Sequence, residues 1–307
     1  MKKIFMAIAS VVLACGIGVA AVGCAGGFDP EGAINLYNRE PGSGTRDAFL
    51  ELIEVKEEDL ATSSSFDSTG AVLTAVAGDP NGIGYISLGS VDDTVNALKV
   101  DGVEASAANV INETYGISRP FEIMYQQEKY EENDLLRDFV TYLESSDAQK
   151  VISDYGYVSV YSDADPYVAP TEDFKTTTLN IGGSTSVQPL MSVDEKVDGK
   201  DIPCLITAYK EACGQDVQIK YDGTGSGTGI TNAGDGTYDI GFASKAVSQS
   251  DFSGVKAEMV IYQLCKDGIA VIVNKDNTVV TDVTIAQLAD IYTGVITTWN
   301  ELSGDAE

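Results

Sequence analysis

Residues 38–49 read NREPGSGTRDAF: an arginine, then a turn of glycine, serine and threonine, then the start of a helix predicted over 46–53. The stretch AINLYNRE at 33–40 has the composition of a strand. A turn of this kind between a strand and a helix directs several free backbone N–H groups at one point, where the helix dipole adds about half a positive charge. These residues therefore predict a site for a phosphate or sulfate ion.

The same device recurs as GGSTS at 182–186 and as GTGSGTG at 223–229. Each copy follows a predicted strand and precedes a predicted helix, and its hydroxyl groups supply further donors to an anion. Helix capping by serine or threonine, worth about 1 kcal/mol, is the simpler explanation of any single turn. Three similar turns, one of them with Arg39 four residues before its serine, favour an anion site.

The composition limits the function. The chain has 307 residues, 47 of them acidic and 19 basic, and a formal net charge of −28, which argues against a nucleic-acid partner. A small anion in a buried site responds to local dipoles more than to distant, screened charges. The sequence contains no histidine and no phosphate-loop, nucleophile-elbow, zinc or calcium pattern. We expect a binding protein without metal or cofactor, and not an enzyme.

Residues 1–24 form a predicted lipoprotein signal segment. Lys2 and Lys3 precede an apolar run from about residue 4 to residue 22, and small residues precede Cys24, the expected site of lipid attachment. A transmembrane anchor is the alternative, because the run is nearly long enough to span a bilayer. Cys15 is a weaker second candidate for lipidation. We expect a lipid-anchored protein on the extracellular face of a bacterial cell membrane.

Strands and helices alternate along the rest of the chain, which indicates an α/β architecture. Further strands are expected at 82–89, 179–182, 238–244 and 268–274. A helix is expected from Leu136 to Gly156, and a second helix has one apolar face made of Ile202, Leu205, Ile206 and Tyr209. Residues 161–178, rich in proline, acid and threonine, predict a linker.

The cysteines of the body predict no disulfide. Cys204 and Cys213 lie nine residues apart in the second predicted helix, about 13 Å at 1.5 Å per residue, which is too far to bridge. Cys265 lies in an apolar, strand-like run. All three are expected to be buried free thiols.

The blocks NREPGSGTRDAF, GIGYISLGS, GGSTSVQPLM, GTGSGTGI, DIGFASK and LADIYTGVITTWNEL together resemble the phosphate-binding lipoprotein of bacterial high-affinity phosphate ABC importers. The resemblance covers nearly the whole mature chain. It implies a two-lobed, type II periplasmic-binding-protein-like fold with an anion held in the cleft between the lobes. It also implies delivery of inorganic phosphate to an ABC permease, without covalent chemistry.

The order of these blocks differs from that of the usual family member, in which the GSTSV block comes first and ITTWNEL leads directly into NREPGSGT. We therefore expect a circular permutation with the old ends joined by residues 161–178. A fragment of two tandem copies and a swapped dimer are the alternatives. One lobe would combine 28–87 with 267–307 and the other would be 88–266, with hinge strands near 83–89 and 264–274.

The resemblance also implies which residues hold the anion. Arg39, with its two-pronged guanidinium, heads the first turn. The residues that match the family's phosphate-binding turns are Arg39, Ser43, Gly44, Thr45, Ser184, Thr185, Ser186, Ser226 and Ser244. Each is open to a simpler interpretation as a helix cap or, for Arg39, as a surface ion-pair residue.

Ser244 departs from the family pattern, because some members place an aspartate there. Hydrogen phosphate has an O–H to donate and sulfate has none, so a buried carboxylate can discriminate between them by about four powers of ten. Asp222 is the first candidate for this acceptor and Glu40 the second. Three alternatives to a phosphate importer component remain: a surface sensor or adhesion protein of the same fold, a binder of another tetrahedral oxyanion, and, more weakly, a phosphomonoesterase.

Overall fold

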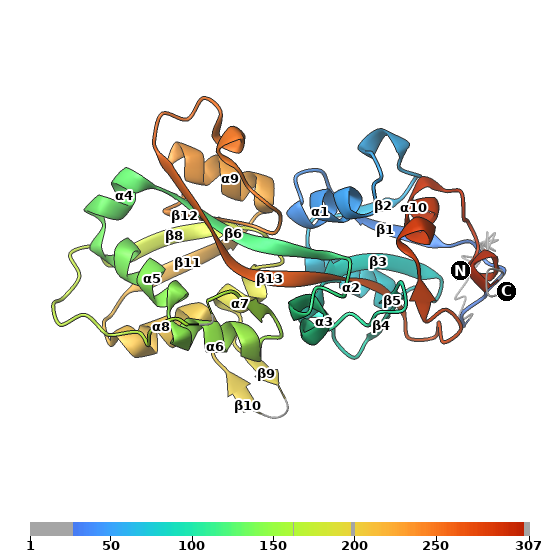
Figure 1. Cartoon of the computed structure of the whole chain (residues 1–307), viewed down its shortest axis with the longest axis horizontal. Helices are drawn as coiled ribbons and strands as arrows, with labels where there is room; N and C mark the ends of the chain where they lie inside the picture. The colour runs from blue at the N-terminus through green and yellow to red at the C-terminus, as the bar shows by residue number, and fades with distance from the viewer. Residues whose placement is uncertain (1–26, 162, 198–199, 304–307) are drawn as a thin grey trace, which may run out of the picture.

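A ten-stranded sheet extends through both halves of the molecule in the order β11-β8-β12-β6-β13-β3-β1-β2, with β4 and β7 also paired to β13 (Figure 1). The computed structural model describes residues 27–161, 163–197 and 200–303. The strands of the sheet are β1 (Asn35–Arg39), β2 (Ser64–Phe66), β3 (Gly82–Ser87), β4 (Val95–Ala97), β6 (Ser118–Gln126), β7 (Val158–Ser159), β8 (Thr178–Gly183), β11 (Gln218–Gly223), β12 (Ile240–Ala243) and β13 (Met259–Asn274). Two smaller sheets pair β5 (Lys99–Val100) with β14 (Asp282–Val283) and β9 (Glu195–Val197) with β10 (Lys200–Ile202).

Each half contains three parallel strands. We call lobe A the half with β8, β11 and β12, and lobe B the half with β1, β2 and β3. The carboxyl ends of the two sets meet between the lobes, where Thr45 Oγ1 lies 2.9 Å from Ser186 Oγ. Ligands of α/β proteins bind beyond the carboxyl ends of parallel strands. The topology therefore directs both sets of strand ends to one place.

Two antiparallel strands, β6 and β13, connect the lobes (Figure 1). β13 pairs with β6 over 259–268 and with β3 over 269–273. The hinge expected near 264–274 therefore falls within β13. The one expected near 83–89 is wrong: β3 ends at Ser87, and the chain returns as β4, which pairs with the end of β13 in the same lobe. β6 makes the second crossing instead.

Separate apolar cores stabilise the two lobes. The core of lobe A includes Phe139, Tyr209 and Phe242, whereas that of lobe B includes Phe49 and Trp299. The lobe boundary expected at residue 88 lies near residue 117 instead. The reason is that the buried side chains between 95 and 117 pack in the cores of lobe B; they are Val95, Leu98, Val100, Val110, Tyr115 and Ile117.

The helices cover both faces of the sheet (Figure 1). They are α1 (Gly44–Leu52), α2 (Thr69–Ala77), α3 (Ala107–Ile111), α4 (Gln127–Glu132), α5 (Asp134–Glu144), α6 (Ser146–Asp154), α7 (Gln188–Ser192), α8 (Leu205–Cys213), α9 (Ser226–Asp235) and α10 (Ile285–Thr293). The single helix expected over 136–156 is two helices, because Ser145 is extended and its side chain caps α6 at Ala148 N. Ile202, expected on the face of the next helix, ends β10.

The predicted linker runs without helix or strand over its described residues as far as β8, which begins at Thr178. It packs on lobe A, since the Tyr167 hydroxyl donates to Asp138 and its ring meets the Tyr142 ring edge to face. The N-terminal and C-terminal segments of the described chain also contact each other: Ile34 N donates to Thr297 O, and Asn300 N donates to Pro30 O.

Cys204, Cys213 and Cys265 are buried free thiols, as predicted. Cys204 precedes α8 as its N-cap residue, and Cys213 ends the helix. Cys24 and the rest of the predicted signal segment lie outside the described residues. Within the part of the chain that the structure describes, none of the helices has the length and apolar character needed to cross a membrane.

Gly183, at the end of β8, leaves no room for a side chain beside the lobe interface. Its φ is +133°, and a Cβ added there would lie 2.3 Å from Phe242 O.

We expect Gly183→Ala to lower the free energy of unfolding by about 2 kcal/mol or more, because the strain and the clash act together. Urea titration measures the change. Gly78→Ala is the matched control, since Gly78 has a φ of −89° and only ordinary contacts; equal effects of the two substitutions would contradict this reading of Gly183.

Candidate functional site

The arginine of the first turn lies between the two lobes. Arg39 ends β1 and is only 2% exposed. Its guanidinium donates to Phe66 O and Asp67 O and to the hydroxyls of Thr69 (3.3 Å) and Thr185 (3.0 Å). Thr185 belongs to lobe A and the other partners to lobe B. Arg39 therefore reaches from one lobe to the other.

Arg39 forms no ion pair within the described residues. Burial lowers the pKa of its guanidinium and Tyr85 opposes that shift; with the smaller effects of Arg119, which lowers the pKa, and of Glu40 and Asp67, which raise it, the pKa is about 10. The side chain still carries its charge at neutral pH. A buried charge without a counter-ion is costly by several kcal/mol, so this arrangement calls for an anion.

Arg119 provides the contrast. Arg119 lies on β6, a strand that crosses between the lobes. Its Nη2 lies 2.9 Å from Asp267 Oδ2 of β13, and both side chains are buried. Burial raises the pKa of Asp267 to about 6, against the opposing effect of the guanidinium. Arg119 Nη1 also donates to Ser244 O (3.0 Å). This pair is internally neutral, and it ties the two crossing strands to the end of β12.

Hydroxyl groups surround Arg39. Ser186 Oγ lies 2.9 Å from Thr45 Oγ1 and 3.0 Å from Thr69 Oγ1, so the β8–α7 turn contacts two turns of the opposite lobe. Ser184 Oγ accepts from Ser186 N (3.2 Å), which fixes the turn itself. All of these side chains are buried. The hydroxyls therefore face each other in a space shielded from water.

Ser226 and Ser244 complete the arrangement from lobe A. Their hydroxyl oxygens lie 3.3 Å apart, and Ser226 Oγ accepts from Ser244 N. Gly44, the first residue of α1, faces them from lobe B: a Cβ on Gly44 would lie 2.4 Å from Ser226 Oγ. A side chain at this position would hold the lobes apart, which explains the glycine of the first turn.

The structure brings the predicted site residues together. Arg39, Gly44, Thr45, Ser184, Thr185, Ser186, Ser226 and Ser244 lie in one interlobe cluster of hydrogen bonds and close contacts, which we call the hydroxyl cluster. Ser43 caps α1, where its side chain accepts from Arg46 N. The interpretation of the turns as helix caps is thus correct for Ser43. It does not account for the contacts between lobes.

Neither predicted carboxylate acceptor joins these contacts among the described residues. Asp222 lies 2.8 Å from Lys220 in a surface ion pair, and its side chain is 39% exposed. Glu40 is exposed. Glu40 directly follows β1 and Asp222 is the penultimate residue of β11, so both are close to the site in sequence. Their side chains belong to the surface.

Thr69 is the member that sequence reasoning missed. It opens α2, directly after the cap residue Ser68, in the stretch DSTGAV at 67–72. This is a fourth serine–threonine–glycine turn between a strand and a helix. The signal was therefore present, but β2 is only three residues long and exposed at its start, so the turn did not stand out.

A groove of about 580 Å³ leads to the hydroxyl cluster from between the lobes. Thr69 and Thr185 line it together with Gly89 and Gln188.

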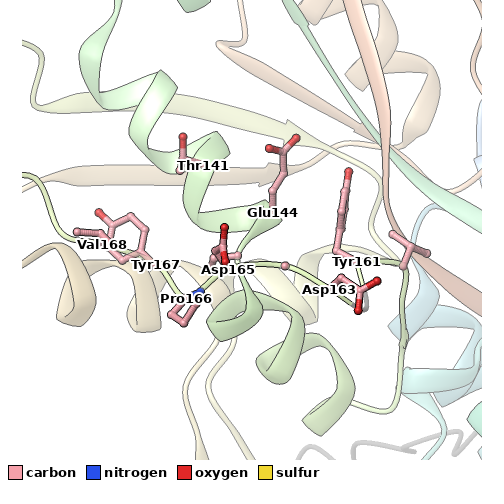
Figure 2. Close-up of a pocket in the computed structure, with 11 residues that line it drawn as sticks. Thr141, Glu144, Tyr161, Asp163, Asp165, Pro166, Tyr167 and Val168 are labelled. Atoms are coloured by element: carbon pink, nitrogen blue, oxygen red, sulfur yellow. The ribbon is translucent and has the colours of Figure 1, made fainter.

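A separate pocket of about 650 Å³ lies on lobe A beside the predicted linker, where Glu144, Asp163 and Asp165 gather with Tyr161 and Tyr167 (Figure 2). Its carboxylates make it unsuitable for an anion. Among the described residues, no group of acidic or cysteine side chains is arranged to hold a metal ion.

Comparisons with known proteins agree with this architecture. The model of a PBP superfamily domain matches residues 26–147 and 168–307. Phosphate-binding protein PstS 2 of Streptococcus agalactiae is 38% identical over 302 residues, which cover 94% of each chain. Phosphate-binding protein PstS 2 of Streptococcus pneumoniae is 34% identical over 298 residues, with the same coverage. The crystal structure of a phosphate-binding protein of a phosphate ABC transporter from Streptococcus pneumoniae superposes with a TM-score of 0.66 at 34% identity, over 88% of this chain and 100% of that chain.

These matches show no circular permutation. An alignment that covers 94% of both chains means that the blocks follow in the same order here as in the Streptococcus agalactiae protein. The two-lobed fold predicted from the resemblance is confirmed by the superposition. The rotated order is not confirmed.

The two aspartates offer a test of the site's organisation. At pH 8, where Asp267 is ionised, Asp267→Asn should lower the free energy of unfolding by about 3–5 kcal/mol, because Arg119 loses its counter-ion in a buried place. Asp222→Asn should leave the urea midpoint nearly unchanged, because exposed ion pairs contribute little. A large loss in Asp222→Asn, or none in Asp267→Asn, would contradict the assignment of one as buried and structural and the other as a surface residue.

Proposed function

Because the chain belongs to the PstS family of phosphate-binding proteins, we propose that it binds inorganic phosphate between its lobes at the hydroxyl cluster. The proposed ligand residues are those of the cluster together with the backbone of the α1 turn: Arg39, Ser43, Gly44, Thr45, Thr69, Ser184, Thr185, Ser186, Ser226 and Ser244. Binding is non-covalent, and one anion bridges the two lobes.

One observation carries this proposal: Arg39 is buried and charged, and it has no carboxylate partner within the described residues. A phosphate ion supplies the missing negative charge. The planar guanidinium can present two N–H groups to two oxygens of a tetrahedral anion. Its four present acceptors, two carbonyls and two hydroxyls, keep it aimed at the interface.

The remaining donors surround the other oxygens. α1 and α9 both begin at this interface, so their free N–H groups and dipoles favour an anion. Hydroxyl pairs such as Thr45–Ser186 and Ser226–Ser244 now bond to each other and can exchange those bonds for phosphate oxygens. Hydroxyls also accept, so they can pair with the O–H of hydrogen phosphate without a carboxylate.

Delivery to an ABC permease follows from the family, as does a place outside the cytoplasmic membrane. We propose that Cys24 carries the lipid anchor, on the strength of the signal pattern at 1–24. Replacement of Cys24 by alanine should release the protein into the medium, as detected by immunoblotting of culture fractions. Retention of the variant on the membrane would favour the transmembrane alternative.

The phosphate assignment can be tested by isothermal titration calorimetry. The wild-type protein should bind one phosphate per chain, and Arg39→Met should weaken binding about 100-fold or more, because a buried charge-assisted interaction is lost. Arg137→Met is the control, since Arg137 lies on α5 of lobe A and donates to the backbone carbonyls of Tyr130 and Glu131 in α4. Binding of sulfate or molybdate alone would redirect the ligand, and wild-type affinity of Arg39→Met would refute the site.

Thr69 allows a finer test of the same site. Thr69→Val removes the hydroxyl that contacts Arg39 and Ser186 while keeping the side-chain volume, and should weaken phosphate binding about 10- to 150-fold, as expected for one hydrogen bond to a charged group. Thr69→Ser keeps the hydroxyl and should remain within about threefold of wild type. If both variants bind alike, the hydroxyl is not a ligand.

A further inference from the structure

A second charged contact joins the lobes at the edge of the hydroxyl cluster. Lys245 Nζ lies 2.8 Å from Asp47 Oδ2, and the two residues are 198 positions apart in the sequence. Their side chains are 26% and 38% exposed, respectively. The contact therefore lies where the interface opens to solvent.

Each partner lies within two residues of a proposed ligand in the sequence. Asp47 is in the first turn of α1, two residues after Thr45. Lys245 directly follows Ser244, whose backbone is held by Ser226 Oγ and by Arg119. A backbone hydrogen bond from Gly227 N to Gly42 O (3.0 Å) also joins the α1 turn to lobe A, at the start of α9. Figure 1 shows α1 on the side of lobe B that faces α9 of lobe A.

The charge of Asp47 is a problem for an anion site. An acidic residue in the first turn stabilises α1 through the helix dipole. The same carboxylate lies at the helix end that the proposed phosphate would approach, where it repels a second negative charge. Lys245 compensates that charge only when the lobes are together, since it comes from the other lobe.

We infer that Lys245 is a positioning residue for the proposed anion site: from lobe A it neutralises Asp47 and ties the α1 turn to the end of β12 when the lobes close. This inference rests on the proposed function. Closure of the lobes and neutralisation of the Asp47 carboxylate then occur together. An open site keeps Asp47 unpaired, and a closed site presents a neutral edge to the anion.

The inference predicts an asymmetry between the two partners. Lys245→Met leaves the Asp47 carboxylate uncompensated, so phosphate should bind at least tenfold more weakly in 0.1 M salt, mainly through faster dissociation. Asp47→Asn removes the repelling charge and leaves Lys245 beside the anion, so the affinity should stay within threefold of wild type. The double variant should bind at least threefold more tightly than Lys245→Met alone. A contact that served only to hold the lobes would make all three variants equally weak.

Titration calorimetry and stopped-flow dissociation of phosphate, on the full chain, measure these effects. Lys129→Met is the matched control, because Lys129 pairs with Asp239 at 3.2 Å within lobe A, and it should bind within twofold of wild type. Lys245→Gln provides a second variant if Lys245→Met folds poorly. The inference is overturned if Lys245→Met binds as wild type does, or if Asp47→Asn fails to restore affinity in the double variant. Failure of the wild type to bind phosphate would overturn the proposed function first, and the inference with it.

Discussion

The organisation of this protein depends on one buried positive charge. Arg39 is enclosed between two lobes and has no ion-pair partner in the described chain, whereas Arg119 nearby is neutralised by Asp267. A protein keeps an uncompensated buried charge at a cost of several kcal/mol, and functional sites are where such costs persist. The rest of the interface is arranged around this charge: the carbonyls of Phe66 and Asp67 accept from the guanidinium, and hydroxyls from both lobes bond to it or to one another.

The topology explains how an acidic chain builds such a place. Parallel strands of both lobes end at the interface, so five loops meet there without any run of basic residues. Helix N-termini and hydroxyls supply partial positive charge locally, while the net charge of −28 is spread over the surface and screened by salt. Glycines at the interface, such as Gly44 facing Ser226, have no side chain to hold the lobes apart. The lobes can therefore approach closely enough for these weak donors to act together.

The sequence predicted the local parts of this arrangement well. Strand–turn–helix units with serine, threonine and glycine are short-range features, and the turns at 41–45, 182–186 and 223–229 lie at the interface as expected. It predicted the long-range parts poorly, because they depend on which strands cross and in what register. The role of β6 as a crossing strand, the pairing of Arg119 with Asp267 and that of Lys245 with Asp47 each join segments more than 100 residues apart. Proximity in sequence was also misleading for Asp222 and Glu40: both positions are close to the site, but their side chains lie at the surface.

A crystal structure of the wild-type protein grown with inorganic phosphate is the most direct test of whether Arg39 and the hydroxyl cluster hold the anion. We expect one tetrahedral density between the lobes, with its oxygens within hydrogen-bonding distance of Arg39 and of hydroxyls from both lobes, Thr45 and Ser226 among them. Phosphate density confined to one lobe or to the surface, with Arg39 still bonded only to Thr69, Thr185 and the backbone, would contradict this expectation.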